Sequence, residues 1–499
     1  MKYMKNFKYL QIILASLLLV NLIACGGESG NKSDVTTKTD DETTETDVST
    51  EELSELEKRQ LVSDDLETVD YEGREFNILS RTNFTYEFDA EQTGDIVDDA
   101  VYNRNRTVEE RFNVDIITHA YGEGNMANVL EVSDKSILAG DDAYQLISAY
   151  TYMAATGSTN GNYMNWYEMP HINFEKPWWA KGFIDEASIA NTVYIATGDL
   201  SLLYNEVTLA MLFNKDLADE LKLDDLYETV REGKWTLDKL MEYSALATTD
   251  LNGDGVMDSN DRWGLGINTY THVDCFLYAF EVPVVEKNSD GIPELVINSE
   301  KMITVLDKVY GFLIDSGNVF VYEHPTDSFE PGMFESGKGL FMTTWLGNCA
   351  NLREMDADFG IIPYPKWDES QEQYSTYYLD RTSSFLVPIT ADIDYVGTIT
   401  EAMAAESYKQ VIPAFYETAL LTKYTRDNES QEMIELILSN VKFDFGNIYT
   451  HTIAGGGSGP GHLLRLCILN KNKNFSSVYA TNEAKFQSNL DKLVEKFVG

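Results

Sequence analysis

The chain has 499 residues, which is enough for two or more domains of ordinary size. Hydrophobic residues make up 43% of the chain, which permits a full core, and the formal net charge is −44. This negative charge repels phosphate backbones and anionic lipid surfaces, and it argues against nucleic-acid binding and against electrostatic adhesion to a membrane.

The first 24 residues have the pattern of a secretory signal. Three lysines precede a short apolar stretch over 12–20, and Leu22-Ile-Ala-Cys25 follows. The apolar stretch is shorter than the roughly 20 residues of a membrane span. The four residues ending at Cys25 resemble a bacterial lipobox. We therefore expect cleavage before Cys25, lipidation of Cys25 (palmitate as one acyl group), and attachment to the outer face of the cell membrane.

Residues 25–68 are predicted to form a disordered acidic tether. They are rich in Gly, Ser, Thr, Asp and Glu and offer almost nothing apolar to bury. Removal of residues 1–24 takes away three lysines and no acids, which leaves the mature chain near −47. The charge of the tether is expected to keep it extended.

Strands and helices then alternate along the first part of the folded region. An alternation of this kind predicts a parallel sheet with helices on both faces. Ligands bind beyond the carboxyl ends of the strands in such sheets, which makes Tyr150 and Tyr152 candidate ligand-binding residues. The expected elements are a strand over 75–80, a helix over 95–112, a strand over 114–118, a helix over 126–138 and a strand over 144–150.

A second set of elements follows in the middle of the chain. A buried strand is expected over 209–213, and Asn214 is expected to open a helix. Thr236 is a natural N-cap for a helix over 237–248. Two further strands are expected over 339–345 and 359–363.

Residues 250–261 resemble a calcium-binding loop. Oxygen side chains fall at loop positions 1, 3, 5, 9 and 12, and a glycine stands at position 6, which is the spacing of an EF-hand-type loop. Asp at position 12 resembles bacterial dockerin-type loops. We expect a structural Ca²⁺ site, although an acidic turn that binds no ion is the alternative. The expected ligands are Asp250, Asn252, Asp254, the backbone carbonyl of Val256, Asp258 and Asp261.

No catalytic constellation is found in the sequence. The six histidines lack metalloprotease spacing, and a glycine-rich segment over 332–339 lacks the Ser or Thr that a phosphate-binding loop needs. Lipidation of Cys25 leaves Cys275, Cys349 and Cys467, whose spacing fits neither a disulfide framework nor a zinc site. We expect them to be buried small hydrophobes, with one bridge between two of them as the alternative.

Four segments, in the same order, resemble the family 1, sugar-binding type of extracellular solute-binding proteins of bacterial ABC importers. The resemblance covers about residues 70–430. The segments are Leu212-Phe-Asn-Lys-Asp-Leu217, Trp235-Thr-Leu-Asp-Lys-Leu240, Phe334-Glu-Ser-Gly-Lys-Gly-Leu-Phe-Met342 running on to Trp345, and Asp358-Phe-Gly-Ile-Ile-Pro-Tyr-Pro-Lys366.

The resemblance implies a two-lobed α/β fold of the periplasmic-binding-protein type (type II). Mixed sheets flanked by helices form the lobes, and a hinge joins them. Residues 69–197 and 376–430 are expected to form the first lobe, and residues 198–375 and 431–499 the second lobe, which contains the loop 250–261. Binding of a solute between the lobes favours the closed form, which a membrane permease then recognises. We expect a monomer.

The resemblance also implies ligand-binding positions. Trp345 matches the stacking Trp of the family, and the two crossovers between the lobes supply further candidates. Trp263, beside the loop 250–261, is an additional aromatic candidate. The full set is Tyr150, Tyr152, Asp199, Ser201, Trp263, Trp345, Arg381 and Thr382.

Three functions are compatible with these features. The first is a lipid-anchored importer component that binds a carbohydrate, because flat aromatic rings stack on sugars. The second is a surface polysaccharide hydrolase, which would need two carboxylates about 5–9.5 Å apart. The third is a binder of peptides, polyamines or other cations. Because no catalytic motif is found, we expect a binding protein and not an enzyme.

Overall fold

The computed structural model describes residues 54–122, 128–322, 331–352, 354–416 and 428–498. The predicted signal and lipidation site at Cys25 lie outside these residues, as does the expected helix start at Met126. In the part of the chain that is described, no helix combines the length and the apolar character that a bilayer crossing needs.

The first sheet has four strands in the order β12-β3-β1-β2. β1 pairs in parallel with both β2 and β3, as the alternation of strands and helices predicts, but β12 is antiparallel to β3. The sheet is therefore mixed. Its strands are β1 (Arg74–Arg81), β2 (Val114–Tyr121), β3 (Leu146–Tyr150) and β12 (Ser383–Leu386).

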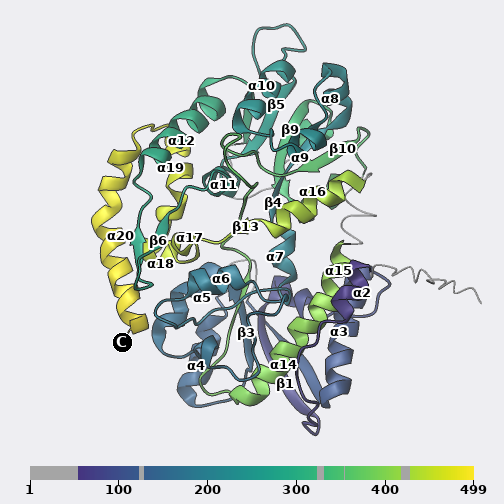
Figure 1. Cartoon of the computed structure of the whole chain (residues 1–499), viewed down its shortest axis with the longest axis vertical. Coiled ribbons are helices and arrows are strands. Elements are labelled where there is room, and N and C mark those ends of the chain that lie inside the picture. Colours follow the sequence, from purple (N-terminus) through teal and green to yellow (C-terminus); the bar gives the residue numbers. More distant parts are fainter. Residues whose placement is uncertain (1–53, 123–127, 323–330, 353, 417–427, 499) are drawn as a thin grey trace, which may run out of the picture. The chain divides into compact units, whose positions relative to one another are not determined.

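The second sheet has five strands in the order β10-β4-β9-β5-β8. β4 is antiparallel to β9 and β10, whereas β5 is parallel to β8 and β9. Figure 1 shows the strands of the two sheets as two separate groups. The strands are β4 (Leu209–Asn214), β5 (Trp263–Asn268), β8 (Val319–Tyr322), β9 (Gly339–Trp345) and β10 (Phe359–Ile362).

Helices surround the sheets, and short strand pairs complete the described structure. The strand pairs are β6 (Val285–Lys287) with β7 (Pro293–Leu295), and β11 (Thr376–Tyr377) with β13 (Val441–Lys442). The helices are α2 (Glu55–Gln60), α3 (Ile96–Phe112), α4 (Leu130–Ala139), α5 (Thr151–Gly157), α6 (Lys181–Ala187), α7 (Leu202–Glu206), α8 (Lys215–Leu221), α9 (Leu226–Arg231), α10 (Leu237–Ala247), α11 (Thr271–Ala279), α12 (Glu300–Tyr310), α13 (Gly332–Glu335), α14 (Ile393–Glu406), α15 (Ile412–Tyr416), α16 (Asn428–Ser439), α17 (Phe445–Ile448), α18 (Thr450–Ala454), α19 (Leu463–Leu469) and α20 (Phe475–Val498).

Local side-chain chemistry sets several helix boundaries. Asp95 caps α3 by accepting the backbone N–H of Val97 at 3.0 Å, and Asn113 ends the helix in the left-handed region. Asn214 caps α8 in the same way, and Thr236 caps α10 as the sequence predicts. Since α8 starts at Lys215, directly after the last residue of β4, no turn residues separate the two elements.

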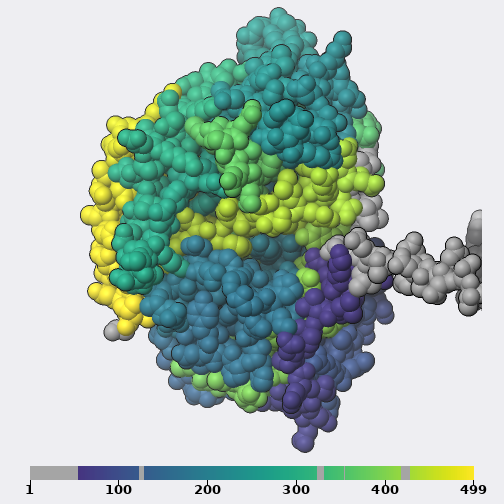
Figure 2. Space-filling view, in the orientation of Figure 1, coloured from purple at the N-terminus to yellow at the C-terminus, as the bar shows by residue number. Residues whose placement is uncertain are grey.

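The predicted end of the tether at residue 68 is too late. Ser54 opens α2 with a capping box, and Asp64 then forms an ion pair with Arg111. Val62 and Leu66 pack against the core. These few apolar contacts hold the segment on the folded unit although its overall composition is acidic. Figure 2 shows this segment, in purple, lying along the surface of the folded unit.

The three cysteines in the described residues are free and buried. Cys275, Cys349 and Cys467 lie in helical segments and pack with apolar neighbours. The interpretation of these residues as small core hydrophobes is confirmed, and the alternative of a bridge between two of them is wrong.

Candidate functional site

A pocket of about 300 Å³ lies where residues from both sheets meet. We call it the Tyr150–Trp345 pocket. Its volume is at the lower end of the range of small-molecule sites, so it fits a small polar solute or one end of a longer one. It is lined by Asn83, Phe84, Tyr150, Leu203, Val207, Trp345, Leu379 and Arg381.

Strand register explains why residues far apart in the sequence line this pocket. Tyr150 ends β3 and pairs with Ser383 of β12, so Arg381 reaches the same sheet edge. Trp345 ends β9 and pairs with Leu209 of β4, so the segment that precedes β4 lies beside it. That segment carries Leu203 and Val207, which form another wall of the pocket.

The aromatic wall of the pocket is held by stacked rings. Tyr150 and Tyr152 stack with ring centroids 5.9 Å apart and an interplanar angle of 20°. Burial raises the pKa of Tyr152 to about 12. The Tyr152 hydroxyl therefore keeps its proton at physiological pH and can donate a hydrogen bond.

Two lining residues, Arg381 and Trp345, carry nitrogen donors. Arg381 lines the pocket, and its Nη2 donates a hydrogen bond to the hydroxyl of Tyr270 at 3.0 Å. The indole Nε1 of Trp345 is buried and has no hydrogen-bond partner among the described residues. A buried N–H without a partner is costly, and a movement of the ring that exposes it to the pocket would let a solute oxygen satisfy it.

A buried ion pair lies directly behind the pocket. The guanidinium of Arg81 is 4.0 Å from the ring centroid of Tyr150 and 4.3 Å from that of Phe84. Arg81 Nη2 lies 3.8 Å from Glu87 Oε2, and both side chains are fully buried. Glu87 also accepts hydrogen bonds from the Ser201 hydroxyl and from the backbone N–H of Leu203. This network links the first sheet to the pocket wall formed by α7.

Of the eight predicted ligand-binding residues, three line this pocket and a fourth stacks against it. Tyr150, Trp345 and Arg381 are in the lining, and Tyr152 supports Tyr150. Ser201 lies behind the pocket in the Glu87 network. The Thr382 hydroxyl is also buried, where it lies 3.0 Å from the hydroxyl of Thr151.

The structure contradicts the placement of Trp263 in this site. Trp263 starts β5 and pairs with Gly339, whereas Trp345 lies at the other end of β9. Its indole Nε1 donates to the backbone carbonyl of Asp258 at 2.8 Å, and its ring packs on Phe320. Trp263 therefore braces the loop 250–261 and is absent from the pocket lining.

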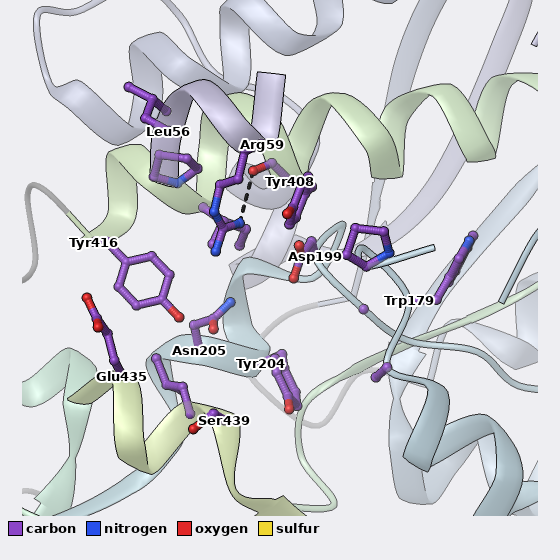
Figure 3. A pocket seen from close by; sticks show the side chains of 16 residues that line it. Leu56, Arg59, Trp179, Asp199, Tyr204, Asn205, Tyr408, Tyr416, Glu435 and Ser439 are labelled. Atoms are coloured by element: carbon purple, nitrogen blue, oxygen red, sulfur yellow. Dashed lines mark hydrogen bonds between the residues drawn. The ribbon is translucent and has the colours of Figure 1, made fainter. Parts of the chain in front are cut away.

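Asp199 lines a different pocket of about 670 Å³, on the other face of α7, which we call the Asp199 pocket. Leu203 and Val207 face the Tyr150–Trp345 pocket, whereas Tyr204 and Asn205 face this one. Burial raises the pKa of Asp199 to about 7, against the opposing charge of Arg59. Figure 3 shows the lining, which is Leu56, Arg59, Pro177, Trp179, Ala180, Gly198, Asp199, Tyr204, Asn205, Tyr408, Ile412, Pro413, Tyr416, Glu435, Leu438 and Ser439.

The loop 250–261 has the turns of a calcium-type loop, but its carboxylates are not drawn together. Asp250 accepts the backbone N–H groups of Gly253 and Gly255, and Gly255 has a φ of 79°. Asp261 accepts the N–H groups of Leu251 and Asp258. Within the described residues, the loop contains no three acidic side chains whose ligand atoms all lie within 4.8 Å of one another. The donor set fits Ca²⁺, but its side chains would have to move inward to bind the ion.

Sequence reasoning missed Asn83, Phe84, Arg81 and Glu87. Asn83 and Phe84 lie two and three residues after the end of β1, and Tyr150 ends the neighbouring parallel strand β3. The rule that selected Tyr150 would therefore have selected them. No local sequence pattern marks Arg81 and Glu87 as a pair, because acidic residues are abundant throughout the chain.

Comparisons with solved structures identify the fold. An ABC substrate-binding protein from Listeria monocytogenes, solved in complex with cycloalternan, is 12% identical with a TM-score of 0.50; the match covers 85% of this chain and 98% of that one. A sugar transporter from Rhizobium etli in an open conformation is 12% identical, with a TM-score of 0.53 and coverage of 85% and 99%. UgpB from Mycobacterium tuberculosis, in complex with glycerophosphocholine, is 13% identical, with a TM-score of 0.53 and coverage of 85% and 99%.

This chain has the fold of the substrate-binding proteins of ABC importers. The predicted mixed α/β fold of the periplasmic-binding-protein type is thereby confirmed. No family model matches the chain, and no curated protein matches it either. At these identities the comparison establishes the fold, and the function has to be argued from the site.

Proposed function

We propose that this protein is an extracellular solute-binding component of an ABC importer that binds a carbohydrate or a related polar solute in the Tyr150–Trp345 pocket. The observation that carries the proposal is the convergence of Tyr150, Trp345 and Arg381 in one pocket. These side chains come from both sheets and from the segment before β12. A solute bound there contacts both sheets at once, which is how solute binding favours a closed form.

The chemistry of the lining favours a solute with hydroxyl or acidic oxygens. Flat aromatic faces suit a sugar ring, and the indole N–H of Trp345 suits a hydroxyl oxygen. Arg381 favours a sugar acid or a phosphodiester as a second class of solute. The same cation disfavours polyamines, which were one alternative from the sequence. Solved neighbours carry cycloalternan and glycerophosphocholine, which belong to the two favoured classes.

The proposed transport role explains why the chain would carry a lipidation site and an acidic tether at its N-terminus. In this proposal Cys25 carries the lipid anchor, the acidic tether holds the binding unit outside the cell, and a membrane permease receives the solute. A solute captured close to the membrane has only a short distance to diffuse. The protein acts as a monomer and releases its solute chemically unchanged.

A thermal-shift screen tests the proposed solute class. Neutral oligosaccharides, sugar acids, glycerophosphodiesters, peptides and polyamines are added in turn, because a ligand that binds only the folded state raises the melting temperature. We expect a concentration-dependent rise with one of the first three classes. A rise with polyamines or peptides alone would contradict the proposal.

We also propose that the loop 250–261 binds Ca²⁺ as a structural ion. The ligands are the oxygens of Asp250, Asn252, Asp254, Asp258 and Asp261, together with the backbone carbonyl of Val256. The proposal rests on this donor spacing and on the sharp turn at Gly255. Calorimetric titration with Ca²⁺ should show binding that an Asp250→Ala/Asp254→Ala variant lacks, and identical traces would end the idea.

A further inference from the structure

Two histidines and an aspartate from distant parts of the chain converge near the pocket wall. Asp380 directly precedes Arg381, His451 lies in α18, and His462 ends the short helical turn Pro460–His462. His451 Nε2 lies 3.2 Å from Asp380 Oδ2, and His462 Nε2 lies 3.7 Å from the same oxygen. One ligand atom from each of the three residues lies within 4.8 Å of the other two.

A glycine-rich turn brings the two histidines together. Gly455, Gly456 and Gly457 all have positive φ, which lets the chain reverse between α18 and the turn that carries His462. Gly459 then packs so closely that an added Cβ would lie 2.0 Å from the backbone oxygen of Thr450. The backbone between residues 455 and 459 therefore reverses the chain and brings the His451 and His462 imidazoles close to Asp380.

The cluster is largely buried, and one of its side chains has a polar atom without a partner. The Asp380 and His462 side chains are only 4% and 3% exposed. His462 Nδ1 makes no hydrogen bond with any described residue, whereas Asp380 Oδ2 has the His451 imidazole beside it at 3.2 Å. The His451 side chain is 28% exposed, which leaves a path for an ion and for water. Buried polar atoms without partners are rare in folded proteins, and here one belongs to the ring whose other nitrogen, Nε2, faces Asp380.

The surrounding charges allow a cation at this point. Arg465 lies nearby, but its Nη1 is 3.3 Å from the buried carboxylate of Asp274, which balances its charge. The Arg381 guanidinium points its Nη2 to the hydroxyl of Tyr270, at 3.0 Å, and its positive charge is the one that a bound cation has to tolerate.

We propose that Asp380, His451 and His462 bind a divalent transition-metal ion of the zinc class. Two imidazoles and one carboxylate are a common zinc ligand set, with water in the fourth position. Ligand distances of about 2.0–2.2 Å in a tetrahedron place neighbouring donor atoms about 3.4 Å apart. The separations of 3.2 Å and 3.7 Å lie on either side of that value.

The bound ion ties the segment that carries Arg381 to the C-terminal helices. The ring of His451 lies 4.7 Å from that of Tyr152, which in turn stacks on Tyr150 of the pocket. The metal therefore braces one wall of the Tyr150–Trp345 pocket from behind. The proposal of a metal site does not depend on the proposed transport function, because metal binding is measured without any transported solute.

Calorimetric titration with Zn²⁺ tests the proposal on protein that carries no polyhistidine tag and has been freed of metal with a chelator. We expect one saturable site per chain. His451→Ala removes a partly exposed ligand, and Asp380→Asn replaces a charged ligand with an isosteric amide. Each should weaken Zn²⁺ binding by at least about tenfold. The melting temperature without metal shows which variant is folded, and His451→Ala is the decisive one because its side chain is partly exposed.

His171→Ala is the matched control, because His171 also faces a carboxylate, at 2.9 Å from Asp394, but belongs to no group of three such ligands among the described residues. It should leave the Zn²⁺ affinity unchanged, and so should Asp250→Ala/Asp254→Ala. The proposal is overturned if the wild type shows no saturable Zn²⁺ binding. It is also overturned if folded His451→Ala keeps the wild-type affinity, or if His171→Ala weakens binding equally.

Discussion

The buried pair of Arg81 and Glu87, which lies behind the pocket, allows a quantitative prediction of how much one substitution lowers the free energy of unfolding. Arg81 Nη2 and Glu87 Oε2 are 3.8 Å apart, with both side chains fully buried. Coulomb's law at an effective dielectric constant of about 20 gives about 4 kcal/mol of attraction at that distance. Removal of one partner leaves the other charge buried without its counter-charge. We expect Arg81→Met and Glu87→Gln each to lower the free energy of unfolding by about 3–5 kcal/mol.

The assay is a double-mutant cycle measured by urea denaturation, with fluorescence and circular dichroism as separate probes. The variant with both substitutions leaves neither partner of this pair without its counter-charge, so its loss should be smaller than the sum of the single losses by about 2–4 kcal/mol. If the losses instead add to within about 0.5 kcal/mol, the two side chains are uncoupled and the electrostatic reasoning fails. Trp345→Phe is a suitable control, because it changes the pocket without touching the pair.

Three further predictions concern other parts of the chain. Since burial raises the pKa of Asp199 to about 7 from its ordinary 3.8, the folded state binds this proton more tightly, and stability is lost as the pH rises from about 4 to about 7. Asp199→Asn should therefore raise the melting temperature more at pH 8 than at pH 5, and an equal change at both would contradict this pKa. Gly459→Ala should cost about 1–3 kcal/mol through the contact with Thr450, whereas Gly311→Ala, whose added Cβ meets nothing within 4 Å, should cost little in the same denaturation assay. Cys25→Ser should move the protein from the membrane fraction to the medium in a bacterial host, and unchanged membrane retention would contradict the lipid anchor.

Local patterns in the sequence predict much of the fold. Apolar runs identify β4 and β10, and capping chemistry identifies the starts of the helices after Asn214 and Thr236. The strand-end rule and the family resemblance place Tyr150 and Trp345 in one pocket. The predictions of strands and helix starts succeed because each depends on residues that are close together in the chain, whereas the ligand-binding roles of Tyr150 and Trp345 stay predictions.

The features that were missed depend on long-range contacts. Asp380, His451 and His462 have no local metal-binding spacing, and only the paths of the return segment and of the glycine-rich turn bring them together. Helix α2 was assigned to the tether because the acidic composition outweighed its few apolar residues. Trp263 was misplaced because an aromatic residue at a strand start looks the same in sequence as one at a strand end.

The central claim is that solute binds in the Tyr150–Trp345 pocket and leaves unchanged. Calorimetric titration with maltotetraose, a cyclic oligosaccharide, a sugar acid and glycerophosphocholine, followed by chromatography of the recovered solute, tests it directly. We predict one-to-one binding of at least one probe and full recovery of the intact solute. Affinity should fall at least about tenfold in Trp345→Ala, since 1.4 kcal/mol of lost contact is sufficient, and should stay unchanged in Trp263→Ala. Binding of none of the probes, conversion of the solute, or an unchanged affinity in Trp345→Ala would contradict the account.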